Sequence, residues 1–166
     1  MSDYKMIVYT DGGCSGNQNA ENYGGWGAVL VCQETWTNKE VAQKELYGSA
    51  INTTNNIMEL TGTIKALQNI KRKDFPVEVH VDSNYVLKGI TEWIHGWKKN
   101  GWKNSKKKPV ENKELWVQLD EEVTKFEQIK FIKVKAHVGI ELNELADTLA
   151  NKGIDEAKSY ESKGAI

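Results

Sequence analysis

The chain has 166 residues, of which 39% are hydrophobic, so it can bury one sizeable core and two domains are not the default. The formal net charge is -1, so affinity for a polyanion would have to come from an uneven distribution of 21 lysines and one arginine. Cys14 and Cys32 offer neither a disulfide framework nor a CxxC metal spacing, and no apolar run reaches membrane-spanning length, which together favour a cytoplasmic protein.

The first 51 residues have the composition of β-strands. Three segments in this part are rich in Val, Ile, Tyr and Trp and are bounded by Gly or Asn, at 5–10, 26–32 and 45–51. Short strands that follow one another in this way commonly pair as a meander. We therefore expect three antiparallel strands.

Strands and helices alternate in the rest of the chain. Apolar residues from Ile57 to Leu67 recur on one face of a helix of about four turns, which ends before Pro76. The later expected strands are 77–81 and 131–134, and the later expected helices are 85–95, 110–126 and one beginning near 142. Gly153 is a fitting stop for the last helix, followed by a polar, frayed tail.

Alternation of this kind implies parallel strand pairing. The expected architecture is an α/β fold with a mixed sheet and helices packed on its faces. Sites in such sheets lie at the carboxyl ends of the strands. Polar residues that follow the expected strands are therefore the first candidates for chemistry.

Four acidic residues have ordinary explanations when each is taken alone. Asp11 precedes two glycines as in a turn, and Asp82 could cap the helix that follows it. Glu59 stands at capping-box spacing from Asn56, and Asp147 could be a solvated position on an amphipathic helix. Asp11 and Asp82, however, both stand where an apolar strand ends, and neighbouring strands lie about 5 Å apart.

Four carboxylates brought together would repel one another strongly. The repulsion is about 1 kcal/mol per pair at about 4 Å even in water. Two divalent cations would cancel it, and the metal separation of about 3.5 to 4 Å in two-metal phosphoryl-transfer sites fits the strand spacing. Donors that are all oxygen favour Mg2+ or Mn2+ over zinc. The acids therefore predict a two-metal site that cuts phosphodiester bonds.

Five segments of the sequence carry motifs in a fixed order. They are TDGGCSGN (10–17), TTNNIMEL (53–60), VDSNYV (81–86), GITEWIHGWKKNGWK (89–103) and AHVGIELNELAD (136–147). Together they resemble type 1 ribonuclease H, from about residue 5 to residue 153. The resemblance implies the ribonuclease H-like fold, with a five-stranded mixed sheet of three antiparallel strands and then two parallel ones, flanked by helices.

The resemblance also implies an activity. A type 1 ribonuclease H is an endonuclease that hydrolyses the RNA strand of RNA/DNA hybrids and leaves 5'-phosphate and 3'-hydroxyl ends. The residues that match its catalytic acids and metal ligands are Asp11, Glu59, Asp82 and Asp147. Two Mg2+ ions, with Mn2+ as the alternative, are the implied cofactors.

His137 follows the expected strand 131–134 and lies on a loop. A lone loop histidine is usually a solvated side chain. The pattern H-x-G-x-x-x-N-E-x-x-D, which ends at Asp147, matches the family instead. The resemblance implies that His137 assists proton transfer and product departure, and we expect its removal to slow turnover without abolishing it.

Small polar side chains suit an enzyme that senses 2'-hydroxyls on one strand and their absence on the other. The resemblance implies RNA-strand contacts from Cys14, Asn17, Asn55 and Asn56, a contact of Asn84 beside the scissile phosphates, and a contact of Thr54 toward a DNA phosphate. Asn55 and Asn56 could equally form only a helix-entry turn. The segment GNQNAENYGGWG is longer than the short GNPG turn common in the family, which affects the placement of Asn17.

The stretch 97–113 carries seven lysines against one acid, interleaved with tryptophans. A charge run is usually a solvated face, but flat aromatic rings beside lysines can contact a sugar-phosphate strand. The stretch resembles the basic protrusion with which many ribonucleases H grip DNA. The residues expected to bind substrate there are Trp93, Trp97, Lys98, Lys99, Trp102, Lys106, Lys107 and Lys108.

We therefore expect one ribonuclease H domain at 1–153 with a basic protrusion near 93–113, a polar tail at 154–166, and a monomer that binds RNA/DNA hybrid and no membrane. Two alternatives share the fold: a hybrid-binding module without catalysis and a strand-transfer enzyme. A fragment of a reverse transcriptase is a third. Cleavage assays on hybrid, single strands and duplex DNA separate the first two from a ribonuclease H.

Overall fold

The computed structural model describes residues 2–16, 21–134 and 140–162. Its centre is a five-stranded sheet in the order β3-β2-β1-β4-β5. The strands are β1 (Tyr4–Gly16), β2 (Asn22–Glu34), β3 (Glu40–Ile51), β4 (Val77–Val81) and β5 (Ile129–Lys133). The first three pair antiparallel, whereas β4 is parallel to both β1 and β5. The predicted α/β class, with three antiparallel strands followed by two parallel ones, is confirmed.

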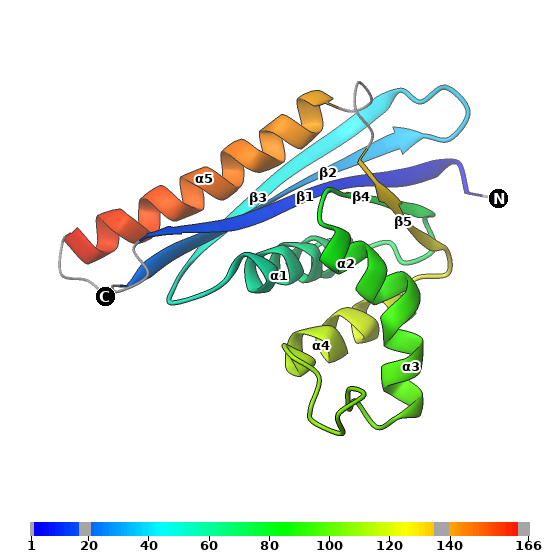
Figure 1. The fold of residues 1–166 in the computed structure, drawn as a ribbon. Coiled ribbons are helices and arrows are strands. Elements are labelled where there is room, and N and C mark those ends of the chain that lie inside the picture. The colour runs from blue at the N-terminus through cyan, green and yellow to red at the C-terminus, as the bar shows by residue number, and fades with distance from the viewer. Residues whose placement is uncertain (1, 17–20, 135–139, 163–166) are drawn as a thin grey trace.

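Helices cover both faces of the sheet (Figure 1). Helix α5 (Ile140–Ser162) lies along one face against β1, β2 and β3, and α1 (Asn55–Gln68) lies on the other face against β1 and β2. Helix α4 (Lys113–Thr124) packs on the outside of α1. The larger core cluster, between the α1 face of the sheet and the helices, includes the fully buried Val8, Leu60, Leu67, Trp116 and Leu119.

One helical run leads away from the sheet to the protrusion at the bottom of Figure 1. It consists of α2 (Asn84–Lys88), a π-helical turn (Gly89–Trp93) and α3 (Ile94–Lys99). The predicted helix 85–95 is therefore confirmed in type and is longer than expected. The predicted helix 110–126 is shorter, because Asn112 has a left-handed backbone (φ 58°) and α4 begins only after it.

The expected end of the last helix at Gly153 is wrong. Helix α5 continues to Ser162 and buries Ile154 and Ala157, so the expected tail from residue 154 is helical through residue 162. A Cβ added at Gly153 would stand 2.2 Å from the carbonyl oxygen of Gly48. The hydroxyl of Ser49 also donates to the Gly153 carbonyl at 2.6 Å. This glycine therefore permits close packing of α5 on β3 and does not end the helix.

None of the helices in the described ranges is long and apolar enough to cross a membrane. Cys14 and Cys32 are both free thiols, as expected from the absence of a disulfide framework in the sequence.

The two helical glycines Gly153 and Gly96 provide a matched test of this packing. Gly153→Ala should lower the free energy of unfolding by about 1–3 kcal/mol, because the added methyl group meets the backbone of β3. Gly96→Ala should raise it by about 0.5–1 kcal/mol, because nothing lies within 4 Å of the added Cβ and alanine favours the helix. Urea denaturation of both variants measures the difference. Equal stabilisation by the two substitutions would contradict the close packing of α5.

Candidate active site

Asp11 and Asp82 lie next to each other because their strands are neighbours. Strands β1 and β4 pair in parallel with Thr10 opposite Val81, so the two acids follow at the next position on each strand. Strand β4 ends there, whereas β1 continues to Gly16. The alternative that Asp11 begins a turn is therefore wrong, because Asp11 lies inside a strand.

Gly12 explains how Glu59 reaches Asp11. A Cβ added at Gly12 would stand 2.5 Å from the carbonyl carbon of Met58 and 2.6 Å from the amide nitrogen of Glu59. The second turn of α1 therefore lies directly on the β1 backbone, at a distance that only glycine permits. This contact places the Glu59 side chain beside the Asp11 carboxylate.

Neither Glu59 nor Asp82 is the cap of its helix. The hydroxyl of Thr54 accepts a hydrogen bond from Ile57 N and caps α1, and the hydroxyl of Ser83 accepts one from Val86 N and caps α2. The capping explanations for the two acids are therefore wrong. Their carboxylates are available for another role.

The pKa values of Asp11 and Glu59 reflect their burial and the nearby carboxylates. Burial raises the pKa of Glu59 to about 9, and repulsion by Asp11 and, more weakly, by Asp82 adds to the shift. Burial also raises the pKa of Asp11 to about 6, with a hydrogen bond from protonated Asp11 to Asp147 as the next cause. The structure thus brings together Asp11, Glu59, Asp82 and Asp147.

The four acids form an inner pair and a rim. Asp11 and Glu59 are partly buried where α1 meets β1, and they share a side-chain hydrogen bond. Asp147, on α5, is exposed and accepts a hydrogen bond from Asn151 at 3.4 Å. Asp82, just beyond β4, has a side chain that is 64% exposed. The inner acids are fixed by packing, and the rim acids face solvent.

The donor set fits a divalent cation by its chemistry. Within the described ranges, no three His, Cys, Asp or Glu side chains are already grouped in a geometry that holds an ion. The fit rests instead on charge, because repulsion by neighbouring carboxylates contributes to the raised pKa values of both inner acids, and a divalent cation would relieve that repulsion. Oxygen-only donors of this kind suit a hard cation such as Mg2+.

Sequence reasoning missed Lys133 at this site. Its Nζ donates to the main-chain oxygen of Asp82 and lies 3.5 Å from Oδ1 of the same residue. Lys133 is the last residue of β5 and stands opposite Val81 in the parallel register. The strand register was the signal that could have found it, because the register places it beside the acid that follows β4.

The polar residues expected to read the RNA strand are partly assembled. The amide of Cys14 donates to Oδ1 of Asn55 at 2.9 Å, which joins the far end of β1 to the start of α1. Asn56 is partly buried in the first turn of α1, and Asn84 is exposed at the first turn of α2. Asn17 and His137 lie outside the described residues.

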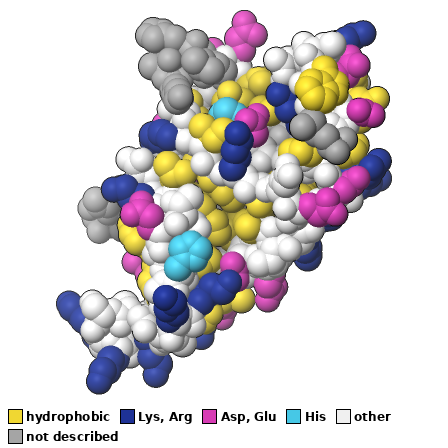
Figure 2. Space-filling model, turned by 90° about the vertical axis from the view of Figure 1, so that its right-hand side faces the viewer, with side chains coloured by type: hydrophobic (Ala, Val, Ile, Leu, Met, Phe, Trp, Pro, Cys, Tyr) yellow, Lys and Arg dark blue, Asp and Glu magenta, His cyan; other side chains and the backbone are white. Residues whose placement is uncertain are grey.

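Asn104 organises the basic turn that follows α3. Its Oδ1 accepts hydrogen bonds from the amides of Lys106 at 2.9 Å and Lys108 at 3.1 Å, and its own amide donates to the Lys108 carbonyl at 2.8 Å. Lys106, Lys107 and Lys108 are all exposed. Figure 2 shows lysine or arginine side chains standing out from the bottom of the molecule, where this turn lies in Figure 1.

The tryptophans and the helical lysines of the protrusion differ in exposure. Trp93 is 40% exposed, whereas Trp97 and Trp102 pack against the core. Lys98 forms an ion pair with Asp120 at 3.1 Å, and Lys99 is exposed. Trp97 and Trp102 therefore anchor the protrusion to the core. Trp93 is the most exposed of the three rings and is the one most open to a ligand.

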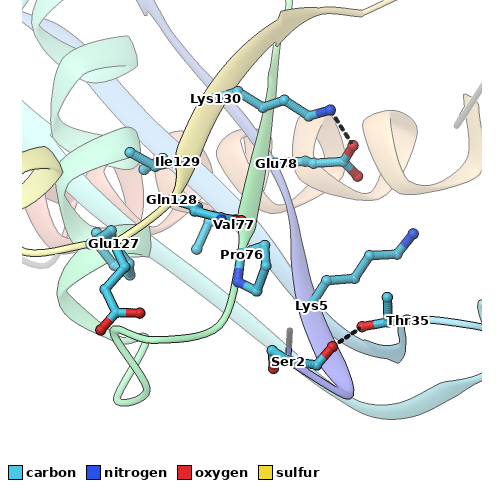
Figure 3. Close-up of a pocket in the computed structure, with 11 residues that line it drawn as sticks. Ser2, Lys5, Thr35, Pro76, Val77, Glu78, Glu127, Gln128, Ile129 and Lys130 are labelled. Carbon is cyan, nitrogen blue, oxygen red and sulfur yellow. Dashed lines mark hydrogen bonds and ion pairs between the residues drawn. The ribbon is translucent and has the colours of Figure 1, made fainter.

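A pocket of about 600 Å³ lies at the other end of the parallel strands. Figure 3 shows Pro76, Val77 and Ile129 among its lining residues, at the amino ends of β4 and β5. Glu78 and Lys130 form an ion pair of 3.2 Å beside it. None of the four acids lines this pocket. Sites in such sheets lie at the opposite, carboxyl ends of the strands.

Known proteins resemble the chain over nearly its whole length. The RNase H family model matches residues 3–155. The Ribonuclease H of Pseudomonas syringae pv. syringae is 49% identical over 160 residues, which cover 95% of this chain and 97% of that protein. The Ribonuclease H of Dechloromonas aromatica is 49% identical over 153 residues, which cover 91% of this chain and 94% of that protein.

Solved structures agree with the sequence relatives. LC9-RNase H1, described as a type 1 RNase H with the type 2 active-site motif, superimposes with a TM-score of 0.80 at 29% identity, covering 95% of this chain and 75% of that one. LC11-RNase H1, solved in complex with an RNA/DNA hybrid, has a TM-score of 0.60 at 25% identity and covers 92% and 99% of the two chains.

The raised pKa values predict how stability depends on pH when a chelator removes divalent cations. Folding raises the pKa of Asp11 from 3.8 to about 6 and the pKa of Glu59 from 4.5 to about 9. At pH values between the two pKa values of each acid, the folded protein binds more protons than the unfolded chain. Their contribution to the free energy of unfolding therefore falls as pH rises through this window. Glu59→Gln should flatten the fall, and Mg2+ should offset it most at high pH.

Urea denaturation with EDTA or Mg2+ across this window measures the effect. Glu127→Gln, at an exposed acid beside the pocket at the amino ends of the strands, is the matched control and should leave the pH dependence as in the wild type. A Glu59→Gln variant with an unchanged slope, or no stabilisation by Mg2+, would contradict the description of the cluster.

Proposed function

The chain belongs to the ribonuclease H family, and on this premise we propose that it is an endonuclease that hydrolyses the RNA strand of RNA/DNA hybrids. Its products would carry a 5'-phosphate and a 3'-hydroxyl. The observation that carries the proposal is that the partly buried pair Asp11 and Glu59 interacts with two further carboxylates, Asp147 and Asp82. A hybrid-binding module would gain nothing from four acids that face phosphate.

We propose that Asp11, Glu59, Asp82 and Asp147 are the ligands of two Mg2+ ions, with Mn2+ as a substitute. When bound, two divalent cations supply positive charge to the attacking water and to the departing 3'-oxygen. Asp11 and Glu59 contribute carboxylates that packing holds in place before substrate arrives. Asp82 and Asp147 contribute carboxylates from the open side.

Two further residues have roles around the acids. Lys133 holds the backbone and carboxylate of Asp82 at the end of β4, so that this rim acid keeps its direction. His137, by its family motif, assists proton transfer and product departure, a role that suits histidine because an ordinary imidazole titrates near neutral pH. The attacking group is water, so no covalent intermediate with the protein is needed.

We propose that Cys14, Asn17, Asn55 and Asn56 contact the 2'-hydroxyls of the RNA strand and that Asn84 lies beside the scissile phosphate. The Thr54 hydroxyl accepts from Ile57 N and keeps its own proton, with which it can donate to a DNA phosphate. The DNA strand lies along the protrusion, against Trp93 and the three exposed lysines of the turn. The same surface includes the exposed Lys99, and it is supported from beneath by Trp97, Trp102 and Lys98.

We also propose that the enzyme is monomeric and cytoplasmic and that one domain carries the whole activity. Free cysteines agree with a reducing compartment. All four acids come from this one chain, with Asp11 on β1, Asp82 just after β4, Glu59 on α1 and Asp147 on α5.

The catalytic assignment predicts the effect of Asp11→Asn. This substitution keeps the size of the side chain and removes the charge, so cleavage of hybrid should fall below detection while hybrid binding stays within about threefold. Cleavage of labelled hybrid with Mg2+ and fluorescence anisotropy in EDTA measure the two quantities. Asp3→Asn, at an exposed acid near the amino end of β1, is the control and should retain activity. Near-normal turnover of Asp11→Asn would remove Asp11 from the catalytic set.

The protrusion predicts a change in salt dependence. Replacing Lys106, Lys107 and Lys108 by Gln should weaken hybrid binding and reduce the slope of log K against log salt by up to about 3, because each lost phosphate contact removes about one unit. A control variant neutralises Lys39, Lys65 and Lys71, which are exposed away from the protrusion. An unchanged slope in the first variant, or an equal change in both, would remove the turn from the interface.

A further inference from the structure

Asn22 clamps the segment that leads from β3 into α1. Its side-chain Nδ2 donates to the carbonyl of Thr53 at 2.9 Å, and its Oδ1 accepts from the amide of the same residue at 2.8 Å. Its main-chain carbonyl accepts from the amide of Asn52 at 3.0 Å. One residue at the start of β2 therefore fixes two consecutive residues of the connecting segment.

The clamped segment is the one that carries the proposed contacts to substrate. Thr53 is 7% exposed, and the next residue, Thr54, caps α1. Asn55 follows, and its Oδ1 accepts from the amide of Cys14 on β1. The segment is thus tied to β2 by Asn22 at one end and to β1 by Asn55 at the other.

The two side-chain bonds require the carboxamide of asparagine. The bond between the Asn22 carbonyl and Asn52 uses the main chain and can form with any residue at this position. The bonds to Thr53 need one donor and one acceptor on the same short side chain, which matches a backbone N–H and C=O together. Aspartate keeps the acceptor and loses the donor, and alanine loses both.

We propose that Asn22 is a positioning residue that presets Thr54, Asn55 and Asn56 and thereby sets how strongly the enzyme depends on 2'-hydroxyls of its substrate. The inference rests on the proposed function. A segment held in its binding geometry before substrate arrives loses less conformational freedom on binding. Without the clamp the segment samples other conformations, so its contacts to the 2'-hydroxyls form only part of the time and contribute less to affinity for the RNA strand.

The acids are independent of this clamp. Glu59 is held against β1 through the close contact at Gly12, and Asp11 lies within β1 itself. Loss of Asn22 should therefore act on substrate affinity and leave the chemical step and its Mg2+ dependence unchanged. This separation between KM and kcat distinguishes positioning of the segment from damage to the active site.

The test compares Asn22→Ala and Asn22→Asp with the matched control Asn69→Ala. Asn69 ends α1 at its other end, where its Nδ2 donates to the Lys65 carbonyl at 2.8 Å, so its loss also removes a side-chain to backbone bond. Substrates are a fully ribose hybrid and hybrids in which one ribose near the cleavage site is replaced by deoxyribose. Kinetics, anisotropy in EDTA and hydrogen exchange of the Thr53 amide are measured.

Asn22→Ala should raise KM for hybrid about tenfold, keep kcat within about twofold, and speed exchange of the Thr53 amide. The penalty for removing a 2'-hydroxyl, large in the wild type, should shrink in Asn22→Ala and be intermediate in Asn22→Asp. Asn69→Ala should keep the wild-type KM and penalty. If Asn22→Ala does not fold, Asn22→Asp is compared with the wild type instead, and smaller changes in KM and in the deoxyribose penalty are expected.

Two outcomes overturn the inference in different ways. With an active wild type, an unchanged KM and an unchanged deoxyribose penalty in both Asn22 variants would reduce Asn22 to a structural residue and leave the proposed function standing. A wild type that does not cleave hybrid would overturn the proposed function and the role of Asn22 with it.

Discussion

The contact between the β1 backbone at Gly12 and the second turn of α1 determines where the charges of this protein lie. A Cβ atom on residue 12 would stand 2.6 Å from the amide nitrogen of Glu59. This close approach places the Glu59 carboxylate beside Asp11. Burial at this contact raises the pKa of both acids. The site follows from a packing constraint, because an ordinary residue at position 12 would separate the two carboxylates.

The acidic residues lie together around this inner pair, whereas most of the exposed lysines of the protrusion lie away from it. Asp82 and Asp147 stand on the open side of the pair, and Lys133 holds Asp82. The exposed lysines of the Asn104 turn lie on a protrusion that α3 carries away from the sheet. A net charge of -1 is therefore compatible with the proposed cation-binding centre and the proposed phosphate-binding arm, because the two lie apart on the domain.

Local patterns in the sequence predicted the strands of the sheet, and the resemblance of five motifs to type 1 ribonuclease H implied the grouping of the four acids. Strand periodicity located β4 and, through its parallel pairing with β1, the adjacency of Asp11 and Asp82. Gly153 was wrongly expected to end the last helix, and Gly12-Gly13 suggested a turn as the alternative explanation for Asp11. Both Gly12 and Gly153 serve contacts between elements distant in sequence, which local preferences do not record. The pairs Asn22–Thr53 and Lys98–Asp120 were missed for the same reason.

The most direct test of the central claim uses a duplex in which one strand is DNA with a central block of ribonucleotides and the other is DNA. The account predicts that, with Mg2+ or Mn2+, cleavage falls only within the ribonucleotide block and leaves 5'-phosphate and 3'-hydroxyl ends, and that EDTA abolishes it. Cleavage of the DNA flanks, joining of strands, cleavage that persists in EDTA, or binding without cleavage would contradict it.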